Sequence, residues 1–438
     1  MEHVHLDLGA LERMLELDRG EDQNRNLLHQ IAVCSECRKV GGYLLELHES
    51  GFLSLSFGPV DVALARSRFA APQLWDRLSS YSQEKRLGLV RASHTFSSWG
   101  LCELLCQKSE RSASQGAAEA IELAELAVLI ADSLEDDEPA EARWLYQLRS
   151  HAWAHLANAR KVAGNLVGAE AAFAMSDEWW RAGEADVGDA LGYGPWIMEL
   201  KASLCTAQRR FPEALELLDR AFEIYTEGSP DQRDRHAAGR ILVQKAFTAA
   251  EMQDLESAVD LLQRAEGYVD PGREPRLLLC LRHNRVDNLN RLHRYTEARA
   301  LLPSVQAISR EIGNALDQVR LRWVEARIDA GLGDREAART GLVEVRREFL
   351  AREMSYDAAL VSLELALLSI EDGRTAEVQE LAEEMTLLFQ SLDVQPEFFA
   401  ALAMFQQAAA LESATAASVR QILKLLKTSH GTPEISSP

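Results

Sequence analysis

Apolar and polar positions alternate with the period of amphipathic helices from about residue 69 to Lys427. Within this region a small residue in a helix-start setting recurs at intervals of 45, 44, 40, 40 and 40 residues. The positions are Ala169, Ala214, Ala258, Ala298, Ala338 and Val378. A sustained period of this size predicts a stack of helical repeats, which presents an extended surface instead of enclosing a catalytic pocket.

Each repeat is expected to be a pair of antiparallel helices. In the clearest one, the first helix carries Trp153 and Leu156, Gly164 makes the turn, and the second helix carries Ala169 and Phe173. Small residues are needed where two helices cross closely, and large ones fill the spaces between crossings. The later repeats keep the second half of the pattern: Ala214, Leu218 and Ala221; Ala258, Leu262 and Ala265; Ala298, Leu302 and Val305; Ala338, Leu342 and Val345; Val378, Ala382 and Met385.

W-x2-L in one helix followed by A-x3-F in the next is the signature of tetratricopeptide repeats. The chain resembles that family over about residues 69–427. The resemblance implies an all-α fold, an α–α superhelix of the tetratricopeptide (TPR) type. Because the period here is 40 to 45 residues instead of the usual 34, we expect longer helices or turns.

The resemblance also implies a binding groove, because the first helix of each tetratricopeptide repeat lines the concave face. Arginine and tryptophan on such a face hold a peptide by charge-assisted hydrogen bonds and stacking, which favours an acidic peptide as ligand. The alternative is a face of packing tryptophans and ion-paired arginines. The expected groove residues are His151, Asn158, Lys161, Trp196, Glu199, Arg240, Phe247, His283, Asp287, Asn290, Arg291, Arg320, Trp323 and Arg327.

Outside the repeats, the pattern predicts three further segments. Residues 1–49 are expected to form a small helical module, and 50–66 a linker interrupted by glycine and proline. The array is then expected over 67–427 and a flexible polar tail over 428–438.

The first module contains a candidate metal site. Cys34 and Cys37 form a C-x2-C pair, whose short loop sets two sulfurs at tetrahedral separation, and His29 lies upstream. His5 is the expected fourth ligand, with His3 as the alternative. Four protein ligands leave no position for water, so zinc would be structural. The other interpretations are two ordinary thiols or a redox pair.

This arrangement resembles the zinc-binding anti-sigma motif of bacteria, an upstream His or Cys followed by H-x3-C-x2-C. Here four residues separate His29 from Cys34. The resemblance covers about the first 45 residues and implies a bacterial transcription regulator that holds a sigma factor away from RNA polymerase. The alternative function is a scaffold or target subunit of a protease-linked or defence assembly, with 50–66 as its cleavable or docking element.

Composition narrows the choice of partners. The formal net charge of −21 disfavours binding to the phosphate backbone of nucleic acids, so we expect a protein partner and no nucleic acid. No apolar run approaches the ~20 residues of a membrane span. The first residues lack the features of a secretory signal, and six cysteines in a long helical chain suggest reduced thiols or a metal site. These features together predict a cytoplasmic location.

No motif indicates an enzyme. The chain lacks G-x4-G-K-[ST], G-x-S-x-G and H-E-x-x-H, and no nucleophile, base and oxyanion set is evident. Two pairs with i, i+4 spacing, Cys102 with Cys106 and His151 with His155, could each chelate a metal. Packing and groove roles are the favoured interpretation of both pairs.

Overall fold

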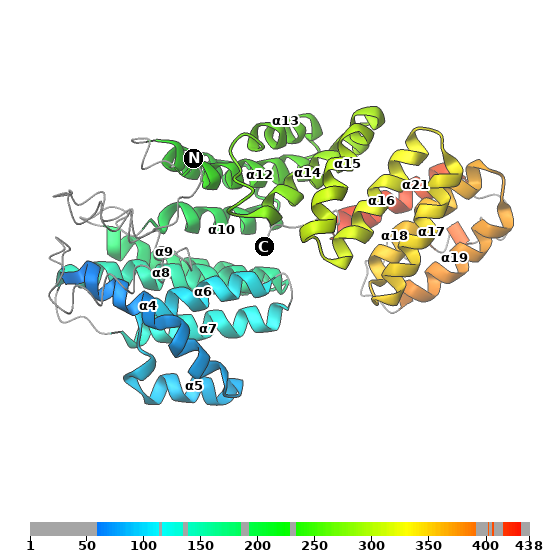
Figure 1. Ribbon diagram of the computed structural model, residues 1–438. Coiled ribbons are helices and arrows are strands. Elements are labelled where there is room, and N and C mark those ends of the chain that lie inside the picture. The colour runs from blue at the N-terminus through cyan, green and yellow to red at the C-terminus, as the bar shows by residue number, and fades with distance from the viewer. Residues whose placement is uncertain are drawn as a thin grey trace. The chain divides into compact units, whose positions relative to one another are not determined.

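The computed structural model describes residues 59–113, 116–134, 139–184, 192–227, 234–390, 402, 405–406 and 415–430. These residues form 17 α-helices and one short 3-10 helix, with no strand among them (Figure 1). The all-α prediction is confirmed. The chain divides into two compact units, residues 1–233 with Pro438 and residues 234–437.

Unit 1 contains eight described α-helices. They are α4 (Pro59–Ser79), α5 (Gln83–Ala92), α6 (Trp99–Ala113), α7 (Ala117–Ser133), α8 (Pro139–Val162), α9 (Leu166–Glu184), α10 (Gly194–Ala207) and α11 (Phe211–Thr226), with the 3-10 helix η1 (His94–Phe96) between α5 and α6. Three of the pairs, α6/α7, α8/α9 and α10/α11, pack as successive hairpins, and α4 packs on α6.

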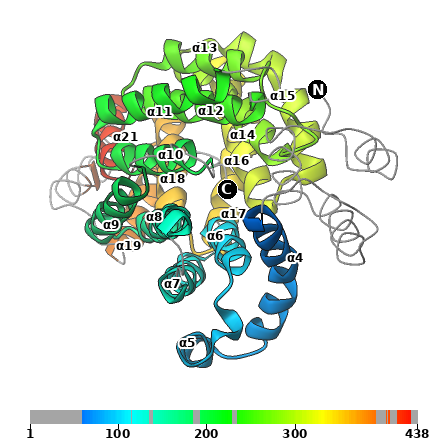
Figure 2. The same ribbon diagram turned by 90° about the vertical axis from the view of Figure 1, so that its left-hand side faces the viewer.

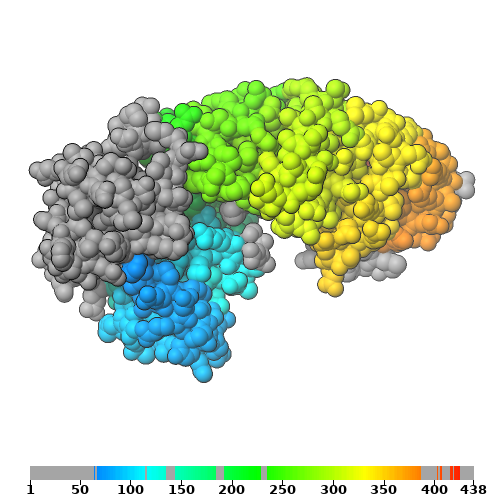
Figure 3. Space-filling model, viewed as in Figure 1, coloured from blue at the N-terminus to red at the C-terminus, as the bar shows by residue number. Residues whose placement is uncertain are grey.

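Unit 2 contains nine described helices. They are α12 (Arg235–Glu251), α13 (Leu255–Ala265), α14 (Pro275–Arg291), α15 (Tyr295–Ile312), α16 (Ala315–Gly331), α17 (Arg335–Ala351), α18 (Ser355–Glu371), α19 (Thr375–Gln390) and α21 (Ala416–His430). Consecutive helices again pair, and α21 packs on α18. In the space-filling view the side chains of this unit form a continuous surface from its green helices to the orange α19 (Figure 3).

We call the first helix of each pair an A helix and the second a B helix. The A helices are α6, α8 and α10 in unit 1 and α12, α14, α16 and α18 in unit 2. In unit 1, α8 contacts both α6 and α10, and in unit 2, α14 contacts both α12 and α16. The A helices of a unit therefore lie side by side and contribute to a common surface.

The repeat register predicted from the small residues is confirmed. All six lie in B helices and are at most 3% exposed, and their partners Phe173, Leu218, Leu262, Leu302 and Leu342 are buried as well. Several of these side chains belong to apolar cores that extend through successive helix pairs within each unit.

The turn from A helix to B helix has the same conformation in six consecutive pairs. One residue in each of these turns adopts a positive φ between 60° and 88°. Glu353, with φ 57°, has a similar conformation but lies in a turn from a B helix to the next A helix. The six residues follow the same steps along the chain as the buried small residues, and they are Gly164, Arg209, Gln253, His293, Gly333 and Gly373. The left-handed position ends the A helix and reverses the chain, so the turn geometry recurs even where glycine does not.

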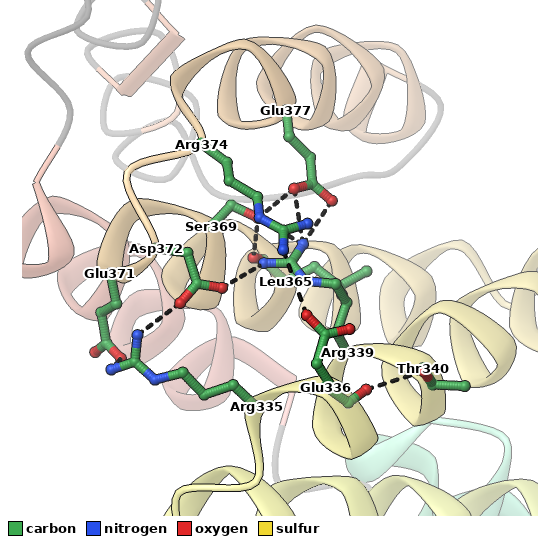
Figure 4. A network of polar contacts seen from close by, with 10 residues as sticks. All are labelled: Arg335, Glu336, Arg339, Thr340, Leu365, Ser369, Glu371, Asp372, Arg374 and Glu377. Carbon is green, nitrogen blue, oxygen red and sulfur yellow. Dashed lines mark hydrogen bonds and ion pairs between the residues drawn. The ribbon is translucent and has the colours of Figure 1, made fainter.

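Ion pairs connect consecutive repeats at the C-terminal end of unit 2 (Figure 4). Arg339 of α17, only 8% exposed, donates to Glu377 at 2.7 Å and to Asp372 at 2.9 Å. Arg335 pairs with the same Asp372 at 2.6 Å. One B helix is thereby tied to the turn after α18 and to the next B helix.

Two predicted boundaries need correction. The linker was expected to reach residue 66, but α4 already begins at Pro59, because proline is well suited to the first position of a helix and helix-forming residues follow it. The tail was expected from 428, but α21 continues to His430. The predicted 1–49 module lies outside the described residues. None of the helices described is long and apolar enough to cross a membrane.

Candidate functional site

The predicted metal ligands His5, His29, Cys34 and Cys37 lie outside the described residues, so zinc at that motif stays a prediction. The predicted groove residues are described, and all of them lie on A helices. They divide between the two units, so each unit has its own set of these side chains.

In unit 2, three A helices are joined through Arg327. Its guanidinium lies 4.0 Å from the ring centroid of Trp323 and pairs with Asp287 of α14 at 3.5 Å and Glu364 of α18 at 2.8 Å. Trp323 is 1% exposed and donates its indole N–H to the same Glu364 at 2.7 Å. These residues therefore hold α14, α16 and α18 together, and little of Trp323 is accessible to a ligand.

On the same three A helices, four further polar side chains each keep a buried atom with no hydrogen-bond partner. The atoms are Nδ1 of His283, Oδ1 of Asn284, Nε of Arg320 and Oδ1 of Asp357. They come from α14, α16 and α18 and include both donors and acceptors. We call this set the unit 2 polar surface. Buried polar atoms normally have partners. A ligand that supplies both kinds of group, such as a peptide main chain, would satisfy these atoms if neighbouring side chains moved aside to expose them.

The pKa values of these side chains reflect burial without full pairing. Burial lowers the pKa of Arg320 despite the nearby carboxylates of Asp357 and Asp317. Burial likewise raises the pKa of Asp357, although Arg320 and Arg327 act in the opposite direction. The pKa of His283 falls to about 4, mainly through burial, so the imidazole is neutral at pH 7.

The remaining predicted residues of unit 2 border this surface. Asn290 is buried, and Arg291 is partly exposed and donates to Asn288 at 3.3 Å. On α12, Arg240 is partly exposed, and Phe247 is 39% exposed, which makes it the most accessible apolar side chain of the predicted groove.

In unit 1, the predicted residues lie on α8 and α10. Asn158 and Glu199 are buried, and Tyr225 donates to Glu199 at 3.0 Å. Lys161 donates to Ser203 of α10 at 2.7 Å, and burial lowers the pKa of its amine to about 8. Trp196 donates to the imidazole of His155 at 3.3 Å. As in unit 2, these side chains connect neighbouring helices.

Sequence reasoning did not single out Glu103 of α6, which is the centre of a buried network. Arg68 of α4 donates to both of its oxygens at 2.7 Å, Trp99 donates at 3.2 Å, and the Tyr193 hydroxyl donates as well. Burial alone would raise the pKa of Glu103, but Arg68 and these hydrogen bonds hold it below its usual range. The carboxylate is therefore charged and compensated.

The structure also brings together two pairs that the sequence presented separately. Cys106 of α6 meets His151 and His155 of α8, and one ligand atom from each lies within 4.8 Å of the others. All three side chains are buried. Cys102 lies beside Cys106 but is not one of the three ligand residues, and its thiol donates to the Ala127 carbonyl of α7 at 3.3 Å. No spacing within one helix could have indicated this meeting, because it depends on the contact between α6 and α8.

A separate shallow hollow of about 420 Å³ lies between α15, α16 and α17. Arg310, Arg322 and Glu344 are among the residues that line it, and none of the predicted groove residues does. The hollow therefore does not belong to the polar surface formed by the A helices.

Comparison by sequence finds no match, neither to a family model nor to a curated protein. Comparison by structure finds helical-repeat proteins. A Rap protein complexed with Competence and Sporulation Factor aligns with a TM-score of 0.51 at 12% identity, covering 75% of this chain and 87% of the Rap chain. This likeness shows that the chain has a tetratricopeptide-like helical-repeat fold.

Two other solved structures are more distantly similar. Aspartyl phosphate phosphatase F from Bacillus subtilis aligns with a TM-score of 0.46 at 11% identity, covering 87% of this chain and 97% of that protein. A Podosopora anserina kinesin light chain with nearly identical TPR-like repeats aligns with a TM-score of 0.36 at 19% identity, covering 50% of this chain and 97% of that one.

Proposed function

We propose that this protein is a non-catalytic regulatory adaptor that binds a protein partner through the unit 2 polar surface. The observation that carries the proposal is the set of unpartnered donors and acceptors at His283, Asn284, Arg320 and Asp357. An extended peptide presents alternating N–H and C=O groups, so it can satisfy both kinds of atom. The Rap protein of similar fold was solved with a factor bound, which agrees with this use of the fold.

Arg320 gives the proposed ligand its chemical character. Its Nε is buried without a partner, and its positive charge is desolvated. An acidic side chain of the ligand would restore both the hydrogen bond and the charge compensation. Arg327 forms ion pairs with two carboxylates, although its Nη2 also has no hydrogen-bond partner. The acidic preference expected from the sequence therefore rests here on Arg320, with Phe247 as an apolar contact on α12.

The partner is identified by affinity purification of the full chain from its native host, followed by peptide arrays of the captured protein. We expect a peptide that contains an acidic residue, and its affinity is then measured by calorimetry. Arg320→Gln should weaken binding by at least about tenfold, since charge-assisted hydrogen bonds contribute about 1.5–3 kcal/mol.

Arg322→Gln is the matched control. Arg322 lies on the same helix, is half exposed and pairs with Glu344 outside the polar surface. This variant should bind the peptide as the parent does. Equal affinities of the parent and Arg320→Gln, or equal losses in the two variants, would place the binding site elsewhere.

For the partner itself, we propose a sigma factor, on the strength of the resemblance of His29, Cys34 and Cys37 to the anti-sigma zinc motif. His5 would complete a structural zinc site whose role is to hold the first module in shape. Zinc is measured by elemental analysis, and sigma factors are sought by mass spectrometry of the captured proteins. Absence of both zinc and a sigma factor from the purified full chain would refute this part of the proposal while leaving the peptide surface untouched.

A further inference from the structure

Cys106, His151 and His155 bring one thiol and two imidazoles together in the interior of unit 1. They are 0%, 8% and 2% exposed, respectively. Their ligand atoms lie within 4.8 Å of one another. Ligand atoms of a tetrahedral zinc ion stand at about 2.0–2.3 Å from the metal and hence about 3.3–3.8 Å from one another, so small side-chain rotations suffice to close the site.

A second observation points to a missing partner. Nδ1 of His151 and Nδ1 of His155 are both buried and have no hydrogen-bond partner. Two buried imidazoles in van der Waals range of each other, with ring centroids 4.6 Å apart, would not be expected to leave polar atoms unsatisfied in an ordinary core. A bound cation could be coordinated by these imidazole nitrogens together with the thiolate.

From this geometry we propose that Cys106, His151 and His155 bind a transition-metal ion of the zinc type. One thiolate and two imidazoles suit the borderline and soft ions of the first row and do not suit calcium or magnesium, which prefer oxygen ligands. Because the residues described around the cluster provide three ligands, the fourth position is taken by water or by a small ligand of the ion.

The surroundings are compatible with a cation. Both histidines are buried, and a neutral imidazole is the form that coordinates a metal ion. The nearby cation Arg68 is compensated by two hydrogen bonds to Glu103. Tyr193 stacks on His151 with ring centroids 4.1 Å apart, which holds that imidazole in place. The Trp196 indole donates to Nε2 of His155, so metal coordination by His155 requires either loss of this hydrogen bond or a change of tautomer.

The position of the cluster gives the metal a structural consequence. Cys106 belongs to α6 and the two histidines to α8, and these A helices lie next to each other within unit 1 (Figure 2). A metal bound by all three residues would link two successive repeats. This metal site is independent of the proposed peptide surface, which lies in unit 2.

The test uses the full chain with Cys34→Ser and Cys37→Ser, so that the first module contributes no thiolate. Cobalt(II) is titrated without oxygen, and thiolate coordination is detected by its charge-transfer band in the near ultraviolet. We expect one equivalent bound with this band. Cys106→Ser should abolish the band, and His155→Gln should weaken cobalt binding at least about tenfold.

Cys280→Ser is the matched control, because Cys280 is an equally buried thiol and lies on α14 of the other unit. It should keep both the band and the stoichiometry. Failure of the parent to bind cobalt, or a band that persists in Cys106→Ser, would overturn the proposal.

X-ray absorption of the zinc-loaded full chain with Cys34→Ser and Cys37→Ser tests the ligands without any substitution within the cluster. We expect one sulfur at about 2.3 Å and nitrogen ligands at about 2.0–2.1 Å. A coordination shell of oxygen and nitrogen without sulfur would exclude Cys106 as a ligand. Neither result depends on whether a sigma factor or a peptide binds.

Discussion

At the scale of single residues, the A-to-B turns keep one backbone conformation although different residue types occupy it. The same left-handed position is occupied by glycine in three turns and by Arg209, Gln253 and His293 in the others. A side chain in this region costs on the order of 1 kcal/mol, which the rest of each repeat evidently tolerates. The turn is therefore imposed by the packing of the two helices, and glycine only lowers its cost.

Gly333→Ala tests this reasoning. The position has φ +88°, and a methyl group added there would meet only open space, so conformational strain is the only new cost. We expect the free energy of unfolding to fall by about 1 kcal/mol, measured by urea denaturation. Gly88→Ala is the opposite control: it lies within α5, also in open space, and should leave stability unchanged or raise it by up to about 1 kcal/mol. Equal effects of the two substitutions would contradict the assignment of strain.

The lowered pKa of His283 predicts how the stability of the fold depends on pH. Its pKa is about 4 in the folded protein against an ordinary value of 6.5, so between these values the unfolded chain binds the extra proton. Stability is therefore lost as pH falls below 6.5, and by pH 5 this residue accounts for about 2 kcal/mol. His283→Gln should lose less stability than the parent between pH 7 and pH 5 in urea unfolding. The exposed His94 provides the control His94→Gln, and identical pH dependence in all three proteins would rule out this role for His283.

At the scale of helices and repeats, the periodicity of the sequence predicted the helical repeats, whereas the side-chain pairings between helices depend on tertiary contacts. The buried small residues and the A-to-B turns follow one register along the chain, so the spacing of the small residues predicted the repeats. The site was less predictable, because it forms between A helices. Neither the pairing of Trp323 with Glu364 nor the meeting of Cys106 with His151 has a signature within one helix. The repeat register alone predicts which helices form the face, but it does not predict which of their side chains are already paired with one another.

The ion pairs between α17 and α19 yield a prediction at this scale. Arg339 is buried and bonds to Glu377, Asp372 and Ser369 (Figure 4). Arg339→Met keeps the apolar stem but leaves those acceptors without their donor, and it should lower the free energy of unfolding by about 2 kcal/mol. Arg335→Met removes an exposed partner of the same Asp372 and should have an effect within experimental error. Urea unfolding of both variants measures these stability losses, and equal losses would contradict the prediction that the buried arginine contributes more.

At the scale of the whole molecule, the net charge of −21 opposes the approach of the acidic ligand proposed here. Long-range repulsion acts mainly through exposed charges, whereas Arg320 is partly buried and acts mainly after contact. Salt therefore affects the two contributions differently. Raising the ionic strength from about 0.01 M to about 0.15 M shortens the Debye length from roughly 30 Å to roughly 8 Å, which screens the repulsion before it weakens the buried contact.

The association rate of an acidic partner peptide should consequently rise with salt over this range, while its dissociation rate changes little. Stopped-flow fluorescence with a labelled peptide measures both rates. In Arg320→Gln the dissociation rate should increase, but the salt dependence of association should remain, because the exposed charges are unchanged. An association rate that falls as salt is added would mean that the ligand meets a locally basic surface or is itself basic, and the acidic preference would then be wrong.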